Sequence, residues 1–395
     1  MFIYNFFFYN FSDIELYCLA TLVAIWLVQT IFYCGIFAKP AGYAKREKRN
    51  KIWFSAAKPN VSVIVYCNEN FTDFEKNIKA FLEQDYPNFE VVVVNDGSDS
   101  DLKDTITLLK EKYANLSYTY VPEGAHSLSR KKLALTVGVK AAKYDIVGFT
   151  EANCRPISDK WLASMARNFI PDIDIVIGNS IESGNEKVKW RYRFYRLFFK
   201  LKYFSYAIMQ RPYMGEGTNM FINKSLFFEN RGFSSNLAIQ YGEDDIFLNE
   251  IMKKGNTRVE LSPESAIENI LHDSDGDMRE MRLRRSFTGK ILKTSAHFVF
   301  GLEQITSILY YVATIGVVLF GIFSNALLIY FAALFFAIRY LYQSIVISKA
   351  SKTLNAGVNG YEALIYDFIR PIENIKFAIR GKNSIDKNYT WRIRR

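Results

Sequence analysis

The sequence has few of the residues that build disulfide frameworks or zinc sites. Its 395 residues include four cysteines and three histidines. The cysteines are scattered, none of them forms a C-x-x-C pair, and the histidines have no metal-ligand spacing. These absences exclude a disulfide-stapled secreted module and a structural zinc domain.

A nucleic-acid-binding motif is also missing, although the net charge is +10. The basic residues instead gather beside apolar segments: six lysines and arginines fall within residues 39–51, and three arginines fall within residues 392–395. An anionic membrane surface attracts such segments. Membrane lipids are therefore a predicted partner, and nucleic acid is not.

Three apolar runs, residues 16–38, 305–323 and 326–347, are long enough to cross a membrane, which takes about 20 residues. A cleaved signal peptide is the alternative for the first run, but no basic residue precedes it and no small-x-small cleavage site follows it. Basic flanking segments mark the cytoplasmic side. The sequence therefore predicts a multi-pass protein of the inner (plasma) membrane whose middle section and C-terminus are cytoplasmic.

These runs divide the chain into five parts. They are an N-terminal segment with the first transmembrane helix (1–40), a basic cytoplasmic linker (41–60), a large domain (61–290), two transmembrane helices (303–347) and a cytoplasmic tail (348–395).

Apolar residues of the tail repeat at helical spacing from Tyr361 to Ile375, with charged residues between them. Charges such as Asp367 and Arg370 would be costly in hydrocarbon, so the pattern predicts an interfacial helix and not a fourth span. Arg339, inside the last apolar run, is expected to face another helix or to extend to the interface.

The domain at residues 61–290 alternates strand-like and helix-like segments. Strands are predicted at 61–66, 89–94, 116–121 and 145–150, the first two of them buried, and helices are predicted at 74–83, 101–112 and 131–142. This alternation is typical of an α/β fold with a mainly parallel sheet. Such sheets bind ligands at the carboxyl ends of their strands.

Polar clusters follow three of these strands. They are Asn68-Glu69, then Asp96, then Glu151-Ala152-Asn153, and a fourth acidic cluster at residues 242–245 precedes an apolar run. Acidic residues at one rim suit a divalent cation that bridges phosphates, or a general base. Taken singly, each is more often a turn residue or a helix cap, but four at sheet ends in one domain favour a site.

The motifs VSVIVYCNEN, LEQDYPNFEVVVVNDGSDSD, SRKKLALTVGVKAAKYDIVGFTEANCRPISDKWL, GTNMFINKSLF and GEDDIFL resemble the ordered series of family 2 glycosyltransferases with the GT-A fold. The resemblance runs from about residue 61 to about residue 285, and the flanking spans resemble membrane-bound bacterial members. It implies an inverting transferase that moves a sugar from a nucleotide-sugar, a UDP-sugar by preference, to a glycan or lipid-linked acceptor. Its product would be a cell-envelope or exported polysaccharide.

The resemblance also assigns roles to single residues. Glu69 and Asp96 match residues that hold the nucleoside, and Lys131 and Lys132 match a basic pair that counters the donor phosphates. Arg284 matches an arginine that pairs with the departing diphosphate.

The family's metal-binding Asp-x-Asp is replaced here by Glu151-Ala152-Asn153. The resemblance implies that Glu151, which would also contact the donor, and Asn153 hold a Mg²⁺ or Mn²⁺ ion. Asn153 offers only a neutral oxygen, which is a weaker ligand for a hard cation.

Asp244 takes the place of the family's catalytic base, with Asp245 as the alternative because the acidic run leaves the register open. The residues matched to the donor and acceptor sugars are Gly217, Thr218, Asn219 and Glu243.

Two other functions stay open. A processive synthase is disfavoured because residues 281–285 keep only Arg284 of the family's Gln-x-x-Arg-Trp element, and because three spans are few for a channel. A catalytically inactive nucleotide-binding scaffold is kept open by Glu151-Ala152-Asn153.

Residues 187–204 interleave basic and aromatic side chains. This pattern predicts a helix on the bilayer surface near the acceptor. An ordinary helix on the domain surface, with lysines that extend to solvent, is the alternative.

Overall fold

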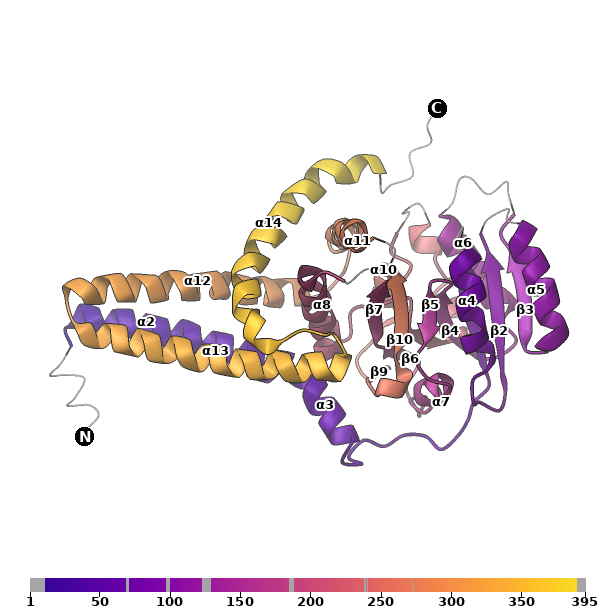
Figure 1. Ribbon diagram of the computed structural model, residues 1–395, viewed down its shortest axis with the longest axis horizontal. Helices are drawn as coiled ribbons and strands as arrows, with labels where there is room; N and C mark the ends of the chain where they lie inside the picture. Colours follow the sequence, from indigo (N-terminus) through magenta and orange to yellow (C-terminus); the bar gives the residue numbers. More distant parts are fainter. Residues whose placement is uncertain are drawn as a thin grey trace.

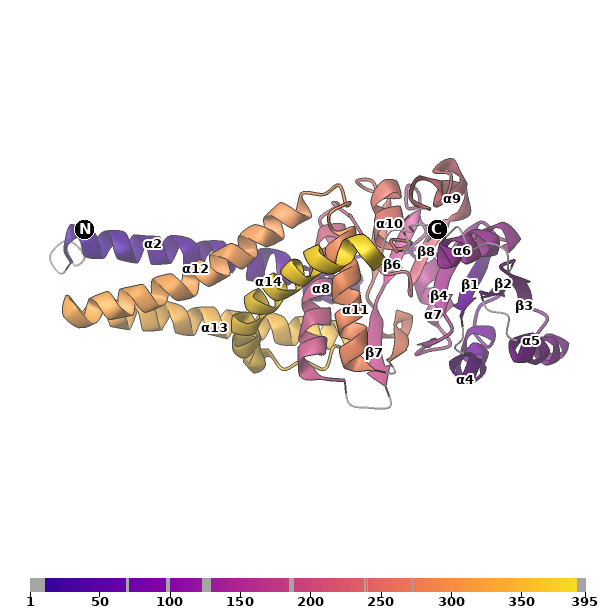
Figure 2. The same cartoon turned by 90° about the horizontal axis from the view of Figure 1, so that it is seen from above.

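The computed structural model describes residues 11–68, 71–96, 100–122, 129–184, 188–237, 239, 241–271 and 273–388. Figure 1 shows an α/β domain at one end of the molecule and three long helices side by side at the other. A group of helices, which includes α8, α11 and α14, lies between them (Figures 1 and 2).

The three long helices come from both ends of the chain. Helix α2 (Asp13–Thr30) begins at a capping box, continues through the π-helical η1 (Ile31–Phe37), and is followed by α3 (Lys39–Glu47). Helices α12 (Ala296–Phe323) and α13 (Ala326–Leu354) complete the bundle. Each of the three is long and apolar enough to cross a membrane. Helix α12 begins earlier, and α13 ends later, than the apolar runs in the sequence.

The α/β domain contains a seven-stranded sheet in the order β3-β2-β1-β4-β8-β6-β9. Strands β3, β2, β1 and β4 are parallel to one another, β8 is antiparallel to both β4 and β6, and β9 is parallel to β6. The prediction of a mainly parallel α/β sheet is confirmed. The strands are β1 (Val61–Cys67), β2 (Phe89–Asn95), β3 (Leu116–Tyr120), β4 (Ile146–Glu151), β6 (Ile175–Gly178), β8 (Met220–Asn223) and β9 (Thr257–Glu260).

Helices α4 (Phe71–Leu82), α5 (Ser100–Lys112) and α6 (Arg130–Ala141) connect the parallel strands. Helix α6 packs closely on β1 and β2 at Gly138, where a Cβ would lie 2.7 Å from Cγ2 of Ile64 and 2.9 Å from Cγ2 of Val94. This close packing fixes the start of α6, and with it Lys131, relative to the carboxyl end of the sheet.

A second, three-stranded sheet has the order β5-β10-β7 and lies beside the end of β4. Its strands are β5 (Cys154–Pro156), β10 (Ile267–Leu271) and β7 (Ser180–Gly184). Shorter helices complete the domain: α7 (Trp161–Ala166), α9 (Lys224–Glu229), α10 (Asp245–Ile251), and the 3-10 helices η2 (Ser234–Asn236) and η3 (Pro263–Ser265). Strand β5 follows directly on Glu151-Ala152-Asn153.

Helix α8 (Trp190–Ile208) is largely buried between the domain and the bundle, so both predictions of a surface helix were wrong. The side chains of Arg196 and Lys200 are each 2% exposed, and both pair with Glu182 at 2.5 and 3.1 Å. Phe198 packs edge-on against Phe37 of η1, with ring centroids 5.6 Å apart. The sequence pattern of a helix whose basic side chains pair with buried carboxylates is the same as that of a helix on a membrane surface. The pattern alone therefore did not distinguish the two.

The C-terminal segment begins with η4 (Gly360–Glu362) and continues as α14 (Ala363–Asn388), which runs through Pro371. Helix α14 leaves the side of the bundle, runs across its long axis and passes over α11 (Ser274–Thr288) (Figures 1 and 2). Arg339 of α13 faces inward, with its Nη2 atom 2.6 Å from Oδ2 of Asp367 of α14.

Candidate active site

A cavity of about 290 Å³ opens beside the end of β4, between the start of α6, strand β10 and helix α11. It is lined by charged and polar side chains from segments far apart in the sequence. The predicted residues that line it are Lys131, Glu151, Asn153, Gly217, Thr218, Glu243, Asp244, Asp245 and Arg284. Those that no motif indicated include Tyr192, Arg196, Glu216, Tyr241, Asn269, Asp277, Glu280, Met281, Arg285 and Thr288.

Lys131 joins two of the predicted acidic residues. Its Nζ atom lies 2.7 Å from Oε1 of Glu151 and 2.7 Å from Oε1 of Glu243. Burial opposes the charged form of Glu243, but the Lys131 ammonium outweighs it and lowers the pKa of Glu243 to about 2. The lysine is therefore a fixed positive charge between the end of β4 and the segment that precedes α10.

Arg285 contacts both aspartates that the sequence left as alternatives for the base. Its Nη2 atom lies 2.7 Å from Oδ2 of Asp244, and its Nη1 atom lies 2.7 Å from Oδ2 of Asp245. The Asp244 side chain is 19% exposed and that of Asp245 only 1%. Asp245 also accepts hydrogen bonds from the Ile246 N–H at 2.8 Å and from the Thr288 hydroxyl. Asp244 is therefore the more accessible carboxylate, and Asp245 lies behind it.

The protonation of Asp245 follows from its position. Burial raises the pKa of its carboxyl, and the positive charge of Arg285 acts in the opposite direction.

The position of Asp244 is fixed from two sides. Its side chain caps α10 by accepting a hydrogen bond from the Asp245 N–H at 2.8 Å. A Cβ at Gly217 would lie 3.2 Å from Cβ of Asp244, tighter than an ordinary contact. Gly217 therefore allows the loop that carries Thr218 to pass close to the carboxylate.

Arg284 lies beside Arg285 on α11 and also lines the cavity. It pairs with Glu280 one turn earlier, and its guanidinium lies 4.2 Å from the ring centroid of Tyr241. The sequence motif indicated Arg284 alone, because the run of arginines does not show which one faces the aspartates. The spacing of Met281, Arg285 and Thr288 along one side of α11 was the available signal.

Glu216 and Arg196 form a buried pair in the wall of the cavity. Arg196 Nη2 lies 2.8 Å from Oε2 of Glu216, which also accepts hydrogen bonds from Ser180 and Tyr203. Burial opposes the charged form of Glu216, but Arg196 outweighs it and lowers the pKa of Glu216 to about 2. Sequence reasoning missed this pair because Arg196 was assigned to a membrane-surface helix.

The two predicted metal ligands both line the cavity. The Nδ2 atom of Asn153 donates to Oδ1 of Asn269 at 3.0 Å, which orients the amide, and Glu151 pairs with Lys131. Among the residues that the structure describes, no group of three or more His, Cys, Asp or Glu side chains could hold a metal ion. Mg²⁺ commonly uses one or two protein oxygens together with substrate phosphates and water, so this pair fits an open site of that kind.

The balance of charge in the cavity also bears on a cation. Among the described residues, its lining holds seven carboxylates and four cationic side chains, an excess of three negative charges. A diphosphate would add further negative charge, so its binding here calls for an additional cation. The carboxylates are Glu151, Glu216, Glu243, Asp244, Asp245, Asp277 and Glu280, and the cations are Lys131, Arg196, Arg284 and Arg285.

Three other predicted site residues lie away from the cavity lining, and Glu69 lies outside the described residues. Asp96, at the end of β2, accepts hydrogen bonds from the Tyr66 hydroxyl at 2.6 Å and from Arg130 Nε at 2.7 Å. Asn219 is fully buried and accepts from Trp161 Nε1 at 3.1 Å. Its Nδ2 atom donates to two backbone carbonyls, so Asn219 holds the loop behind the cavity in place.

Lys132 is fully buried and points away from Lys131. Its Nζ atom donates to the carbonyl oxygens of Asn236, Ile239 and Tyr241 at 2.7, 2.8 and 3.0 Å. Burial lowers the pKa of Lys132 to about 8. Its contacts position the segment that carries Tyr241 at the cavity.

Residues 62–229 match the family model described as glycosyl transferase family 2. No curated protein matches the sequence. Among solved structures, the chain resembles the mannosyltransferase PcManGT from Pyrobaculum calidifontis in complex with GDP-Man and Mn²⁺, at 20% identity and a TM-score of 0.47, over 90% of this chain and 99% of that one. It also resembles GalNAc-T7 with UDP, GalNAc and Mn²⁺, at 15% identity and a TM-score of 0.39, over 55% of this chain and 45% of that one.

Proposed function

Because residues 62–229 match the model of glycosyl transferase family 2, we propose that this chain is an inverting glycosyltransferase of the GT-A type with Asp244 as its catalytic base. The donor is a nucleotide-sugar, with UDP-sugars first among the candidates, and the acceptor is a glycan or a lipid-linked glycan. The reaction takes place at the cytoplasmic face of a bacterial plasma membrane and contributes to a cell-envelope or exported polysaccharide. The accessible position of Asp244, held by Arg285 in the cavity, is the observation that carries this proposal.

Asp244 accepts the proton of an acceptor hydroxyl as the hydroxyl oxygen attacks the anomeric carbon. The bond between that carbon and the diphosphate oxygen breaks on the opposite face, and the nucleoside diphosphate leaves with the bonding electrons. A single displacement of this kind inverts the anomeric centre and needs no second nucleophile. Asp245, buried behind Asp244, supports the reaction by holding Arg285 in place.

The donor side of the site is assigned to two cationic groups that line the same cavity. Lys131 and Arg284 supply positive charge for the diphosphate. The lysine acts as a compact charge, and the planar guanidinium of the arginine can donate two hydrogen bonds to a phosphate. Glu151 and Asn153 would hold a Mg²⁺ or Mn²⁺ ion, which would neutralise diphosphate charge in the transition state. The excess of negative charge in the cavity supports this assignment.

The test is turnover of a nucleotide-sugar panel by the full chain in lipid nanodiscs. The panel contains UDP-, GDP- and dTDP-sugars, with and without lipid-linked acceptors, and released nucleoside diphosphate is measured. Asp244→Asn is compared with Asp172→Asn, a matched change at an exposed residue whose φ of +69° asparagine tolerates. We expect one donor to be turned over, with a loss of about 100-fold or more in Asp244→Asn and none in Asp172→Asn.

Other outcomes of this experiment identify the alternatives. Equal turnover by Asp244→Asn and wild type would refute the assignment of the base. Tight binding of a donor without turnover, for every acceptor, would identify an inactive scaffold. Long polymeric products from one acceptor would identify a processive synthase.

A further inference from the structure

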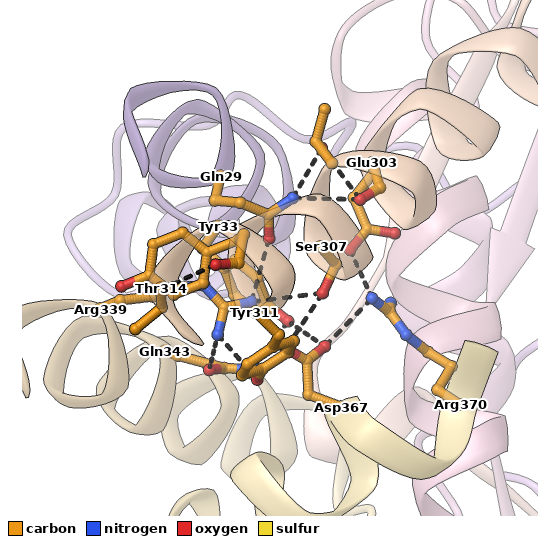
Figure 3. A network of polar contacts seen from close by, with 12 residues as sticks. Gln29, Tyr33, Glu303, Ser307, Tyr311, Thr314, Arg339, Gln343, Asp367 and Arg370 are labelled. Atoms are coloured by element: carbon orange, nitrogen blue, oxygen red, sulfur yellow. Dashed lines mark hydrogen bonds and ion pairs between the residues drawn. The ribbon is translucent and has the colours of Figure 1, made fainter. Parts of the chain in front are cut away.

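Two residues in the first half of α14, Asp367 and Arg370, form ion pairs with helices α13 and α12 of the bundle, as Figure 3 shows. Asp367 Oδ2 lies 2.6 Å from Arg339 Nη2 of α13 and accepts a hydrogen bond from the Tyr311 hydroxyl of α12 at 2.8 Å. Arg370 Nη2 lies 2.5 Å from Oε1 of Glu303 of α12. All four charged side chains are almost fully buried, and their charges balance. Breaking either pair would leave a buried charge alone, so these contacts hold α14 against the bundle.

The face of α14 turned away from these ion pairs is apolar and largely exposed, and Phe368 at its edge also packs against the Tyr311 ring of α12 with centroids 4.0 Å apart. The side chains of this face repeat at spacings of three and four residues, so they form one stripe along the helix. They are Ile365, Phe368, Ile372, Ile375 and Ile379, exposed by 57%, 47%, 69%, 54% and 59%.

A lipid surface is the occupant that this stripe fits. Helix α12, which is long and apolar enough to cross a membrane, also exposes large apolar side chains near its start, with Phe298 exposed by 77% and Ile305 by 57%. Helix α14 is anchored to that same helix through Arg370 and runs across the long axis of the bundle (Figure 1). Its stripe therefore extends the apolar surface of the bundle in the direction of the membrane plane.

The inner face of α14 contacts the helix that carries the active-site arginines. Glu373 Oε2 lies 2.6 Å from Nη1 of Arg282 of α11, and Asn374 Oδ1 accepts a hydrogen bond from Nη2 of the same arginine at 2.8 Å. The Arg282 guanidinium lies 4.6 Å from the ring centroid of Tyr195 and 4.2 Å from that of Phe377. Arg282 is only 4% exposed, so α8, α11 and α14 all contact it in a closed environment.

Arg282 and Arg285 are one helical turn apart and pack on neighbouring rings of α8. The Arg285 guanidinium lies 5.1 Å from the ring centroid of Phe199, and Tyr195 lies one turn before Phe199. A shift of α11 at Arg282 would therefore move Arg285, which holds Asp244 at 2.7 Å. The contacts run without a gap from the lipid-facing helix to the proposed base.

We propose that α14 lies in the lipid surface through its apolar stripe and, through the Glu373–Arg282 pair, braces α11 so that Arg285 and Asp244 keep their positions. Arg282 and Glu373 are positioning residues, since neither lines the cavity. The inference rests on the proposed function only for its kinetic readout.

The role of the Glu373–Arg282 pair in holding α11 is tested by backbone amide hydrogen exchange of the full chain in nanodiscs. Glu373→Gln and Arg282→Gln are compared with Lys376→Gln, which removes an exposed charge from the same helix. We expect faster exchange in residues 274–288 for the first two, wild-type exchange for the control, and a fall in kcat of about tenfold with donor KM nearly unchanged. Wild-type exchange in both Glu373→Gln and Arg282→Gln would overturn the brace.

The lipid contact is tested in vesicles that contain brominated phosphatidylcholine. We expect the fluorescence of an Ile375→Trp variant to be quenched beyond that of the wild type. When Phe368→Gln and Ile372→Gln are added to Ile375→Trp, we expect the quenching to be lost and exchange in residues 274–288 to become faster. When Phe368→Leu and Ile372→Val are added instead, we expect the quenching and the slow exchange to be retained. Absence of quenching in Ile375→Trp would refute the lipid contact. Exchange and quenching need no donor, so failure of every variant to turn over donors would count against the proposed function alone.

Discussion

Arg285 and Asp244 face each other at the cavity wall, with the guanidinium Nη2 atom 2.7 Å from the carboxylate Oδ2 atom. The same guanidinium reaches the buried Asp245, so one cation fixes two adjacent carboxylates. Because the arginine contacts one oxygen of Asp244 most closely, the carboxylate keeps an acceptor position for an incoming hydroxyl proton. This arrangement separates the roles of two aspartates that are neighbours in the sequence.

Replacing Arg285 tests this division of roles. Arg285→Lys offers a compact ammonium that cannot span both aspartates, and Arg285→Gln leaves them without a cation. We expect kcat to fall in both, by about 100-fold in Arg285→Gln. Arg279→Lys, at an exposed position of the same helix, is the matched control and should have wild-type rates. Wild-type kcat in Arg285→Gln would contradict the role assigned here.

The close approach of Gly217 to Asp244 gives a steric prediction. In Gly217→Ala the new methyl group would lie 3.2 Å from Cβ of Asp244, so the carboxylate has to move by a few tenths of an ångström. We expect kcat to fall about tenfold with the thermal unfolding midpoint nearly unchanged. Gly42→Ala is the control, because a Cβ there meets nothing within 4 Å. Equal kcat values for Gly217→Ala and wild type would show that Asp244 tolerates the shift.

The buried carboxylates Glu243 and Glu216 predict how stability depends on acid. Burial opposes their ionisation, but Lys131 and Arg196 outweigh it and lower their pKa values from 4.5 to about 2. A carboxyl whose pKa is lower in the folded state stabilises it above the unfolded pKa, and this contribution is lost as the pH falls. We therefore expect the unfolding midpoint to fall steeply between pH 4.5 and about 2.

Lys131→Met isolates the share of this effect that belongs to Glu243. Without the ammonium, the pKa of Glu243 should rise, so the variant should be less stable at neutral pH and lose less stability on acidification. Lys140→Met, at an exposed position of the same helix, should follow the wild-type curve. Parallel curves for Lys131→Met and wild type would refute the coupling between Lys131 and Glu243.

Chelation tests whether Glu151 and Asn153 hold a cation. We expect EDTA to weaken the binding of the nucleoside diphosphate in calorimetry, and Mn²⁺ to restore it, because the cavity has an excess of three negative charges. Glu151→Gln should bind the nucleotide weakly with or without Mn²⁺. If EDTA leaves the affinity of the wild type unchanged, Lys131 and the arginines are sufficient for the diphosphate and no metal is needed.

Much of the fold follows from local pattern in the sequence. Strands β1, β2 and β4 are mostly apolar and mostly buried, whereas the edge strand β3 is only partly buried. The predicted positions of all four strands differ from the observed ones by at most one residue at either end. The antiparallel strand β8 and the short strands of the second sheet carry no such signal. They depend on long-range pairing, such as Ile146 with Asn223, which periodicity does not encode.

The residues of the candidate site also fall into those that a sequence pattern indicated and those that it did not. Residues at strand ends or beside glycines, such as Glu151 and Gly217, were found by motif and lie in the cavity. Arg285 was missed because neighbouring arginines on a helix differ only in which side they face. Asn219 and Lys132 match motif positions, yet their side chains bond to buried backbone groups, a difference that only the packed structure reveals.

The most direct test of the account is a single-turnover measurement with the preferred donor and a saturating acceptor, comparing wild type with Asp244→Asn at equal donor occupancy. We expect both proteins to bind the donor with similar affinity, the wild type to form product with inverted anomeric configuration, and Asp244→Asn to form product at least about 100-fold more slowly. Product formed at the wild-type rate by Asp244→Asn, or product with retained configuration, would contradict it.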